Sequence, residues 1–79
     1  MSEIEQQVRQ VAADVFNVPA DHITPQSSPE TIESWDSVQH LNLVLALESE
    51  LGVQIDPEEI EQMRSIGAVV ELMERKKQA

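Results

Sequence analysis

Apolar residues recur along this chain with the period of an α-helix, and no stretch of useful length alternates strictly as a half-buried strand does. In the first stretch the apolar positions are Ile4, Val8, Val11, Val15 and Phe16. Ser2 and Glu5 fit the capping box that opens a helix. The pattern predicts a first helix from about residue 3 to residue 16.

Prolines interrupt the chain after this helix. Pro19, Pro25 and Pro29 lie between residues 17 and 35 and exclude a long regular element there. Long structureless connections are uncommon in compact domains. We expect an ordered loop with at most one short helical turn, tied to the core by Ile23 and Ile32.

A second helix is expected to begin after Asp36. Its carboxylate can accept a hydrogen bond from the backbone N–H of Val38 or Gln39, and the Gln39 side chain can reach back. Gly52 then ends the helix near Leu51 as a left-handed cap.

Apolar side chains fill more than half of the helical wheel of this second helix: Val38, Leu41, Leu43, Val44, Leu45, Leu47 and Leu51. We therefore expect a central helix that is packed on several sides. The remaining arc predicts a narrow stripe that faces water or a partner: Gln39, Asn42, Ala46, Ser49 and Glu50.

Two further helices are expected. Start signals are Asp56, Pro57 and Glu59 for a short third helix, and Ser65 for a last one. Apolar positions are Ile60 and Met63 in the third helix, and Ile66, Val69, Val70 and Met73 in the last. The predicted fold class is all-α, a small four-helix bundle of three longer helices and one short, with a long loop between the first and second helices. Residues 1–79 are expected to form a single domain.

Charge and composition narrow the function. The chain has 15 acidic and 5 basic residues, a formal net charge of -10, which repels phosphate backbones and anionic lipids. We therefore expect no nucleic acid and no membrane as partner, but basic protein surfaces, and a monomer. Without cysteine, any thiol chemistry must come from an added group. Glu3 and Glu5 precede the apolar run, which argues against a signal peptide, so a cytoplasmic location is expected.

Enzymatic signatures are mostly absent, and we expect no enzyme and no metal site. His22 and His40 do not form a metal-ligand pair. We interpret His22 as a solvated loop residue and His40 as a helix-surface residue. Trp35, just before the helix cap, is interpreted as a structural staple. An acidic run is interpreted as a solvated helix start: Glu58, Glu59 and Glu61.

Ser37 suits one particular task. By position alone it is a minor polar residue beside a cap. A hydroxyl at a helix N-terminus can nevertheless bear a phosphodiester, because its negative charge lies near free backbone N–H groups and the positive end of the helix dipole.

The run from Trp35 to Glu48 resembles the attachment motif of acyl and peptidyl carrier proteins, in which an Asp-Ser pair opens an apolar helix. Here the pair is Asp36-Ser37, and the run that matches the motif ends in Ala46-Leu47-Glu48. The resemblance continues through Gly52-Val53-Gln54-Ile55 and Ser65-Ile66-Gly67. With the first helix and the long loop, it covers essentially the whole chain.

The resemblance implies that a phosphopantetheinyl transferase moves 4'-phosphopantetheine from coenzyme A to Ser37, beside Asp36. The added thiol would then hold acyl groups as thioesters and present them to acyl-loading and acyl-transferring enzymes that dock on the second helix. Candidate walls for a cargo pocket between the helices are Leu43, Leu47, Leu51, Ile60, Ile66 and Val70. Ordinary core is an equally good interpretation of these residues.

The chain departs from the carriers of dissociated fatty acid synthesis, which usually have Gly before the Asp-Ser pair, Leu after it and acids along the exposed stripe. Here Trp35, Val38 and a largely neutral stripe occupy these places. This favours dedicated partners in a specialised biosynthetic pathway, such as secondary-metabolite, polysaccharide or lipid-modifying chemistry. Two alternatives stay open: a peptidyl or aminoacyl carrier, and an unmodified helical interaction module.

Overall fold

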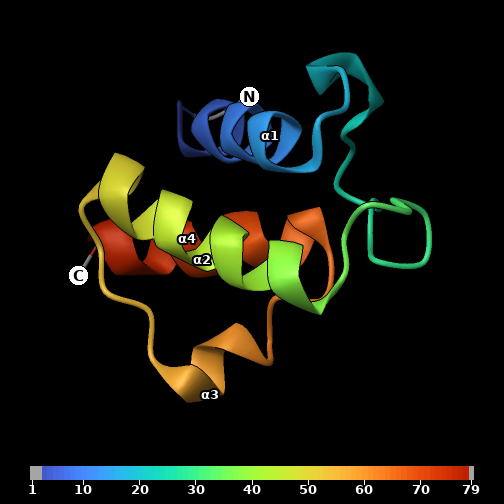
Figure 1. Ribbon diagram of the computed structural model, residues 1–79. Coiled ribbons are helices and arrows are strands. Elements are labelled where there is room, and N and C mark those ends of the chain that lie inside the picture. Colours follow the sequence, from blue (N-terminus) through green and yellow to red (C-terminus); the bar gives the residue numbers. More distant parts are fainter. Residues whose placement is uncertain (1–2, 79) are drawn as a thin grey trace.

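Helices account for all the regular structure in residues 3–78, the part of the chain that this computed structural model describes. They are α1 (Glu3–Phe16), the 3₁₀ turn η1 (Ala20–His22), α2 (Ser37–Leu51), α3 (Pro57–Ile60) and α4 (Ile66–Gln78). The α1 helix packs against both α2 and α4, and α3 lies on the opposite side of α2 (Figure 1). The predicted fold class, a four-helix bundle with a long loop between the first two helices, is confirmed.

The ends of α2 follow the sequence signals. The Asp36 carboxylate accepts the Gln39 backbone N–H at 2.9 Å, and Gly52 ends the helix with a φ of 64°, a conformation that costs glycine little. The predicted reach-back of Gln39 is wrong. Its side-chain oxygen accepts from the Asn42 amide at 2.8 Å, and the Asp36 N–H donates to the Ser34 carbonyl.

The other helix starts agree in part with the prediction. Ser65 caps α4, since its hydroxyl oxygen accepts the Ala68 N–H at 3.2 Å. The α3 helix is shorter than predicted, because it ends at Ile60 and leaves Met63 buried in the following turn. The Ser2 cap predicted for α1 lies outside the described residues.

The proline-containing loop is attached to the N-terminus of α4. The N–H groups of Ile66 and Gly67 donate to the carbonyls of Ser27 and Pro25 at 2.8 and 2.9 Å. A Cβ at Gly67 would lie 3.0 Å from the Pro25 carbonyl oxygen, so this close approach favours glycine. Two buried isoleucines of the loop, as predicted, anchor it to the core: Ile23 and Ile32.

The α2 helix buries only one side. Its buried residues are Leu43, Val44, Leu47 and Leu51. Val38, Leu41 and Leu45 are 68%, 55% and 63% exposed. The prediction that α2 is packed on several sides is therefore wrong. A helical wheel counts apolar residues but not available neighbours, and α3 is too short to cover the side of α2 that α1 and α4 leave open.

An ion pair joins α3 to α4, with the Lys76 ammonium 2.7 Å from the Glu59 carboxylate. This hydrogen bond, followed by the one from the Asp56 backbone N–H, holds the pKa of Glu59 below its ordinary value of 4.5. A carboxylate whose pKa is lowered on folding stabilises the fold above its unfolded-state pKa. That stabilisation is lost as the pH falls through the folded-state pKa.

Replacing Lys76 by Met should therefore lower stability slightly at neutral pH, and the loss should fade as the pH falls below 4.5. Lys77→Met is the matched control, because Lys77 donates to the Leu51 carbonyl at 3.1 Å and that acceptor does not titrate. Urea unfolding of both variants at neutral and acid pH provides the measurement. A Lys76→Met loss that is constant with pH would contradict this account.

Candidate functional site

Ser37 is the first residue of α2, and its side chain is exposed. The first N–H groups of a helix have no partner inside the helix. The Asp36 carboxylate takes up one of them, that of Gln39. The Ser37 hydroxyl thus lies at the positive end of α2, where a negatively charged substituent is stabilised.

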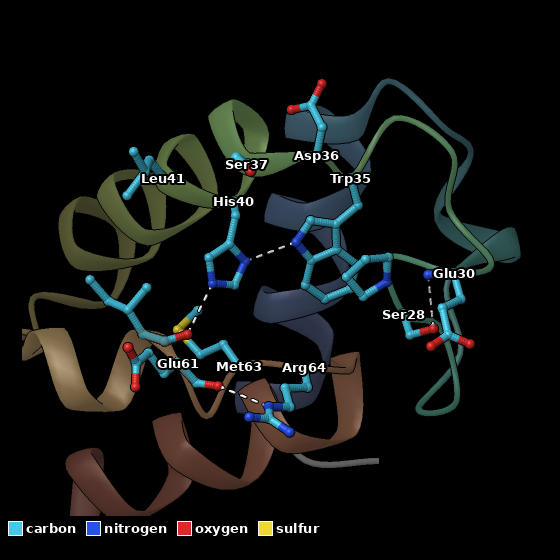
Figure 2. A pocket seen from close by; sticks show the side chains of 12 residues that line it. Ser28, Glu30, Trp35, Asp36, Ser37, His40, Leu41, Glu61, Met63 and Arg64 are labelled. Atoms are coloured by element: carbon cyan, nitrogen blue, oxygen red, sulfur yellow. Dashed lines mark hydrogen bonds between the residues drawn. The ribbon is translucent and has the colours of Figure 1, made fainter.

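An open depression of about 750 Å³ adjoins Ser37 (Figure 2). We call it the Ser37 depression. It lies between the start of α2, the end of the long loop and the segment around α3. Its apolar lining residues are Pro29, Trp35, Leu41, Ile60 and Met63, and its charged residues are Glu30, Asp36, Glu61 and Arg64.

His40 bridges α2 and α3 inside this depression. The Trp35 indole N–H donates to His40 Nδ1 at 2.9 Å, and His40 Nε2 lies 3.0 Å from the Ile60 carbonyl oxygen (Figure 2). An indole N–H can only donate, so Nδ1 must accept and the ring proton must lie on Nε2, facing the carbonyl. Trp35 also stacks on Phe16 of α1, with ring centroids 4.9 Å apart.

The staple predicted at Trp35 is thus confirmed, and its partner within α2 is His40. The interpretation of His40 as an ordinary helix-surface residue is wrong, because its ring is hydrogen-bonded both to the Trp35 indole and to the Ile60 carbonyl. The available signal was the spacing. Trp35 precedes the cap and His40 is the fourth helical residue, the two positions that a hydrophobic staple joins.

The candidate pocket walls are divided by the structure. Only Ile60 lines the Ser37 depression. Val70 is partly buried against the core. The ordinary-core interpretation holds for the others, which are 0–4% exposed: Leu43, Leu47, Leu51 and Ile66.

The described residues form no candidate metal site beside the Ser37 depression. Among them, no three His, Cys, Asp or Glu side chains gather as metal ligands would. His22 is exposed in η1, as expected of a solvated residue. No described helix has the length and apolar character that crossing a bilayer requires.

Known proteins and a protein-family model match this chain along almost its whole length. Residues 6–73 match the family model described as "Phosphopantetheine attachment site". The acyl carrier protein of Thermosynechococcus vestitus is 32% identical over 75 residues, which cover 95% of this chain and 93% of that protein. The acyl carrier protein of Saccharopolyspora erythraea is 33% identical over 70 residues, covering 89% and 74% of the two chains.

Solved structures agree in fold. The holo acyl carrier protein of Geobacter metallireducens matches with a TM-score of 0.87 and 22% identity, over 98% of this chain and 88% of that one. The Enterococcus faecalis acyl carrier protein matches with a TM-score of 0.76 and 29% identity, over 94% of each chain. This chain therefore belongs to the phosphopantetheine-attachment family and, within it, to the acyl carrier proteins.

Proposed function

We propose that the Ser37 hydroxyl is the attachment point of the 4'-phosphopantetheine arm, and that the chain carries acyl thioesters for a specialised biosynthetic pathway. The observation that supports the site most directly is the exposed Ser37 hydroxyl at the capped start of α2, within the residues that match the family model. The protein is a carrier and not an enzyme.

The residues around Ser37 fit such a group. A phosphodiester on the hydroxyl oxygen would lie at the positive end of α2. The arm would start beside the apolar side chains of Leu41, Ile60 and Met63, which line the adjoining depression. When bound, the group supplies the thiol that this cysteine-free chain lacks.

The role of the chain's own residues is to hold Ser37 in a fixed position. Asp36 caps α2 and so holds the turn that carries Ser37. The buried side of α2 fixes this turn on the bundle. A substrate tethered there reaches each docked enzyme at a high effective concentration, without a new binding step.

The interaction with a phosphopantetheinyl transferase and with acyl-handling enzymes follows from the family. We infer that these partners dock on the exposed face of α2 defined by Val38, Leu41, Asn42, Leu45 and Ser49. These residues are exposed and carry no charge. A neutral apolar face selects partners by shape and apolar contact more than by long-range attraction, which supports dedicated partners. We also infer a monomer that works in the cytoplasm, with neither nucleic acid nor membrane among its partners.

Leu45→Ala should slow modification by a phosphopantetheinyl transferase several-fold, because the minority of interface residues that cost more than about 1 kcal/mol on truncation cluster near the interface centre, where we place Leu45. The rate should depend only weakly on salt, since the face is neutral. Ser49→Ala is the comparison on the same face, and it should slow the rate less than Leu45→Ala does, because it removes one hydroxyl and no apolar area. Initial rates at low and high salt provide the measurement. If the modification rate depended steeply on salt and Leu45→Ala had no effect, the docking surface would instead include the acidic residues around α3.

Incubation with coenzyme A and a broad-specificity transferase tests the function itself. Intact mass should rise by one phosphopantetheinyl group, and fragmentation should locate the added mass on Ser37. A chain that gains no mass with any transferase would be an unmodified interaction module. Loading by aminoacyl-adenylating enzymes in preference to acyl-loading ones would make the cargo aminoacyl.

A further inference from the structure

The boundary between α2 and α3 is closed beside Ser37 by a continuous polar chain. It runs from the Trp35 indole through both nitrogens of His40 to the Ile60 carbonyl, with distances of 2.9 and 3.0 Å. Both ring nitrogens of His40 are thereby satisfied. In Figure 2 the rings of Trp35 and His40 lie edge to edge below Ser37, joined by their hydrogen bond.

Other contacts hold the same boundary along its length. At the far end of α2 the Glu48 carboxylate accepts the Ile55 N–H at 2.9 Å. The Lys76–Glu59 pair holds α3 from the side of α4. The α3 segment is therefore tied to the bundle at several points, and moving it away from α2 would break polar contacts that are already formed.

The apolar interior behind this boundary is closely packed. Leu43 and Leu47 of α2 are 0% exposed, and Met63 is 1% exposed. Of these three, only Met63 reaches the Ser37 depression. His40 and Ile60 thus line the open space beside Ser37, whereas Leu43 and Leu47 lie in the buried core.

We propose that His40 is a positioning residue that keeps the α2–α3 boundary shut, so that cargo stays in the Ser37 depression and short acyl groups are the preferred load. This inference rests on the proposed attachment at Ser37. Contact with Leu41 and Ile60 suffices for the arm and a short acyl group. A chain that extends beyond this depression has to remain in water or displace the His40 bridge, which would leave the buried Trp35 N–H without its acceptor.

The protein without any amino-acid substitution, here called the parent protein, provides the first test. Transferase and acyl-coenzyme A donors load the chain with butanoyl or octanoyl groups, and intact mass confirms each load. Methyl NMR should show shifts at Leu41 and Ile60 with both loads, and no octanoyl-specific shift at Leu43 or Leu47. The melting temperature should be the same for both loads. Octanoyl-specific shifts at Leu43 and Leu47, with a higher melting temperature, would overturn the proposal.

The bridge itself is tested by His40→Ala, for which His22→Ala is the matched control because His22 is an exposed histidine. In His40→Ala the octanoyl load should shift Leu43 and Leu47 and raise the melting temperature relative to the butanoyl load. His22→Ala should behave as the parent protein does, with no octanoyl-specific shift at Leu43 or Leu47 and the same melting temperature for both loads. His40→Gln keeps an acceptor and a donor on one side chain, and should restore the exclusion of octanoyl.

Trp35→Phe provides a variant that keeps an aromatic ring but removes the indole donor, in case His40→Ala fails to fold. It should admit octanoyl to a lesser degree than His40→Ala, since the contact of His40 with Ile60 remains. Octanoyl shifts that are identical in the parent protein, His40→Ala and Trp35→Phe would refute the role of the bridge. Failure of every load to attach would instead refute the proposed function, so the two outcomes are distinguishable.

Discussion

Replacing Ser37 by alanine should abolish the attachment of phosphopantetheine completely. The transfer needs a hydroxyl oxygen to accept the phosphoryl group, and alanine has none. The Ser37 side chain is exposed, so its removal should change the free energy of unfolding by no more than about 0.5 kcal/mol. Intact mass after incubation with coenzyme A and transferase should stay at the unmodified value, while the melting curve stays that of the parent protein.

Ser28→Ala is the matched control for this experiment, because Ser28 presents a second hydroxyl at the same depression. This variant should gain the full mass of one phosphopantetheinyl group. Modification of Ser37→Ala, or loss of modification in Ser28→Ala, would show that the attachment site is assigned to the wrong serine.

Leu47→Ala should produce a large loss of stability. Leu47 is 0% exposed in the core shared by α1, α2 and α4. Large-to-small substitutions at such positions cost roughly 2 to 5 kcal/mol, because the lost burial is accompanied by a cavity. A domain of this size loses about 4 to 8 °C in melting temperature per kcal/mol, so a fall of roughly 10 °C or more is expected.

Leu45→Ala is the control for the Leu47 variant, with the same chemical change two residues away on the same helix. Leu45 is 63% exposed, so its truncation should stay within about 0.5 kcal/mol. Thermal and urea unfolding of both variants measure the contrast. Equal losses for the two would mean that α2 is rotated from the orientation described here.

The contrast between these two leucines also marks what a sequence can and cannot decide. Local signals were sufficient for the boundaries of α2. Asp36 and Gly52 act within one turn of their own position, so the start and end of α2 could be read without knowing its neighbours. The resemblance likewise singled out Ser37, since its motif is contiguous along the chain.

Orientation and contact between helices depended on the tertiary structure. Leu45 and Leu47 are chemically identical, and only the positions of α1 and α4 decide which of them is buried. Most of the residues predicted as candidate pocket walls are core residues for the same reason, because their burial depends on neighbouring helices.

The bridge from Trp35 through His40 to Ile60 shows the physical limit most clearly. The position of Trp35 just before the helix cap is a local signal and predicted a staple, but it did not identify His40 as the partner. The acceptor on α3 lies 20 residues further along the chain and is a backbone carbonyl, which carries no sequence signal at all. The sequence by itself therefore determined the order of the helices, the ends of α2 at Asp36 and Gly52, and the motif around Ser37, because these are short-range properties. Only the tertiary structure decided which face of α2 is exposed and what closes the space beside Ser37, because both depend on where distant segments come to rest.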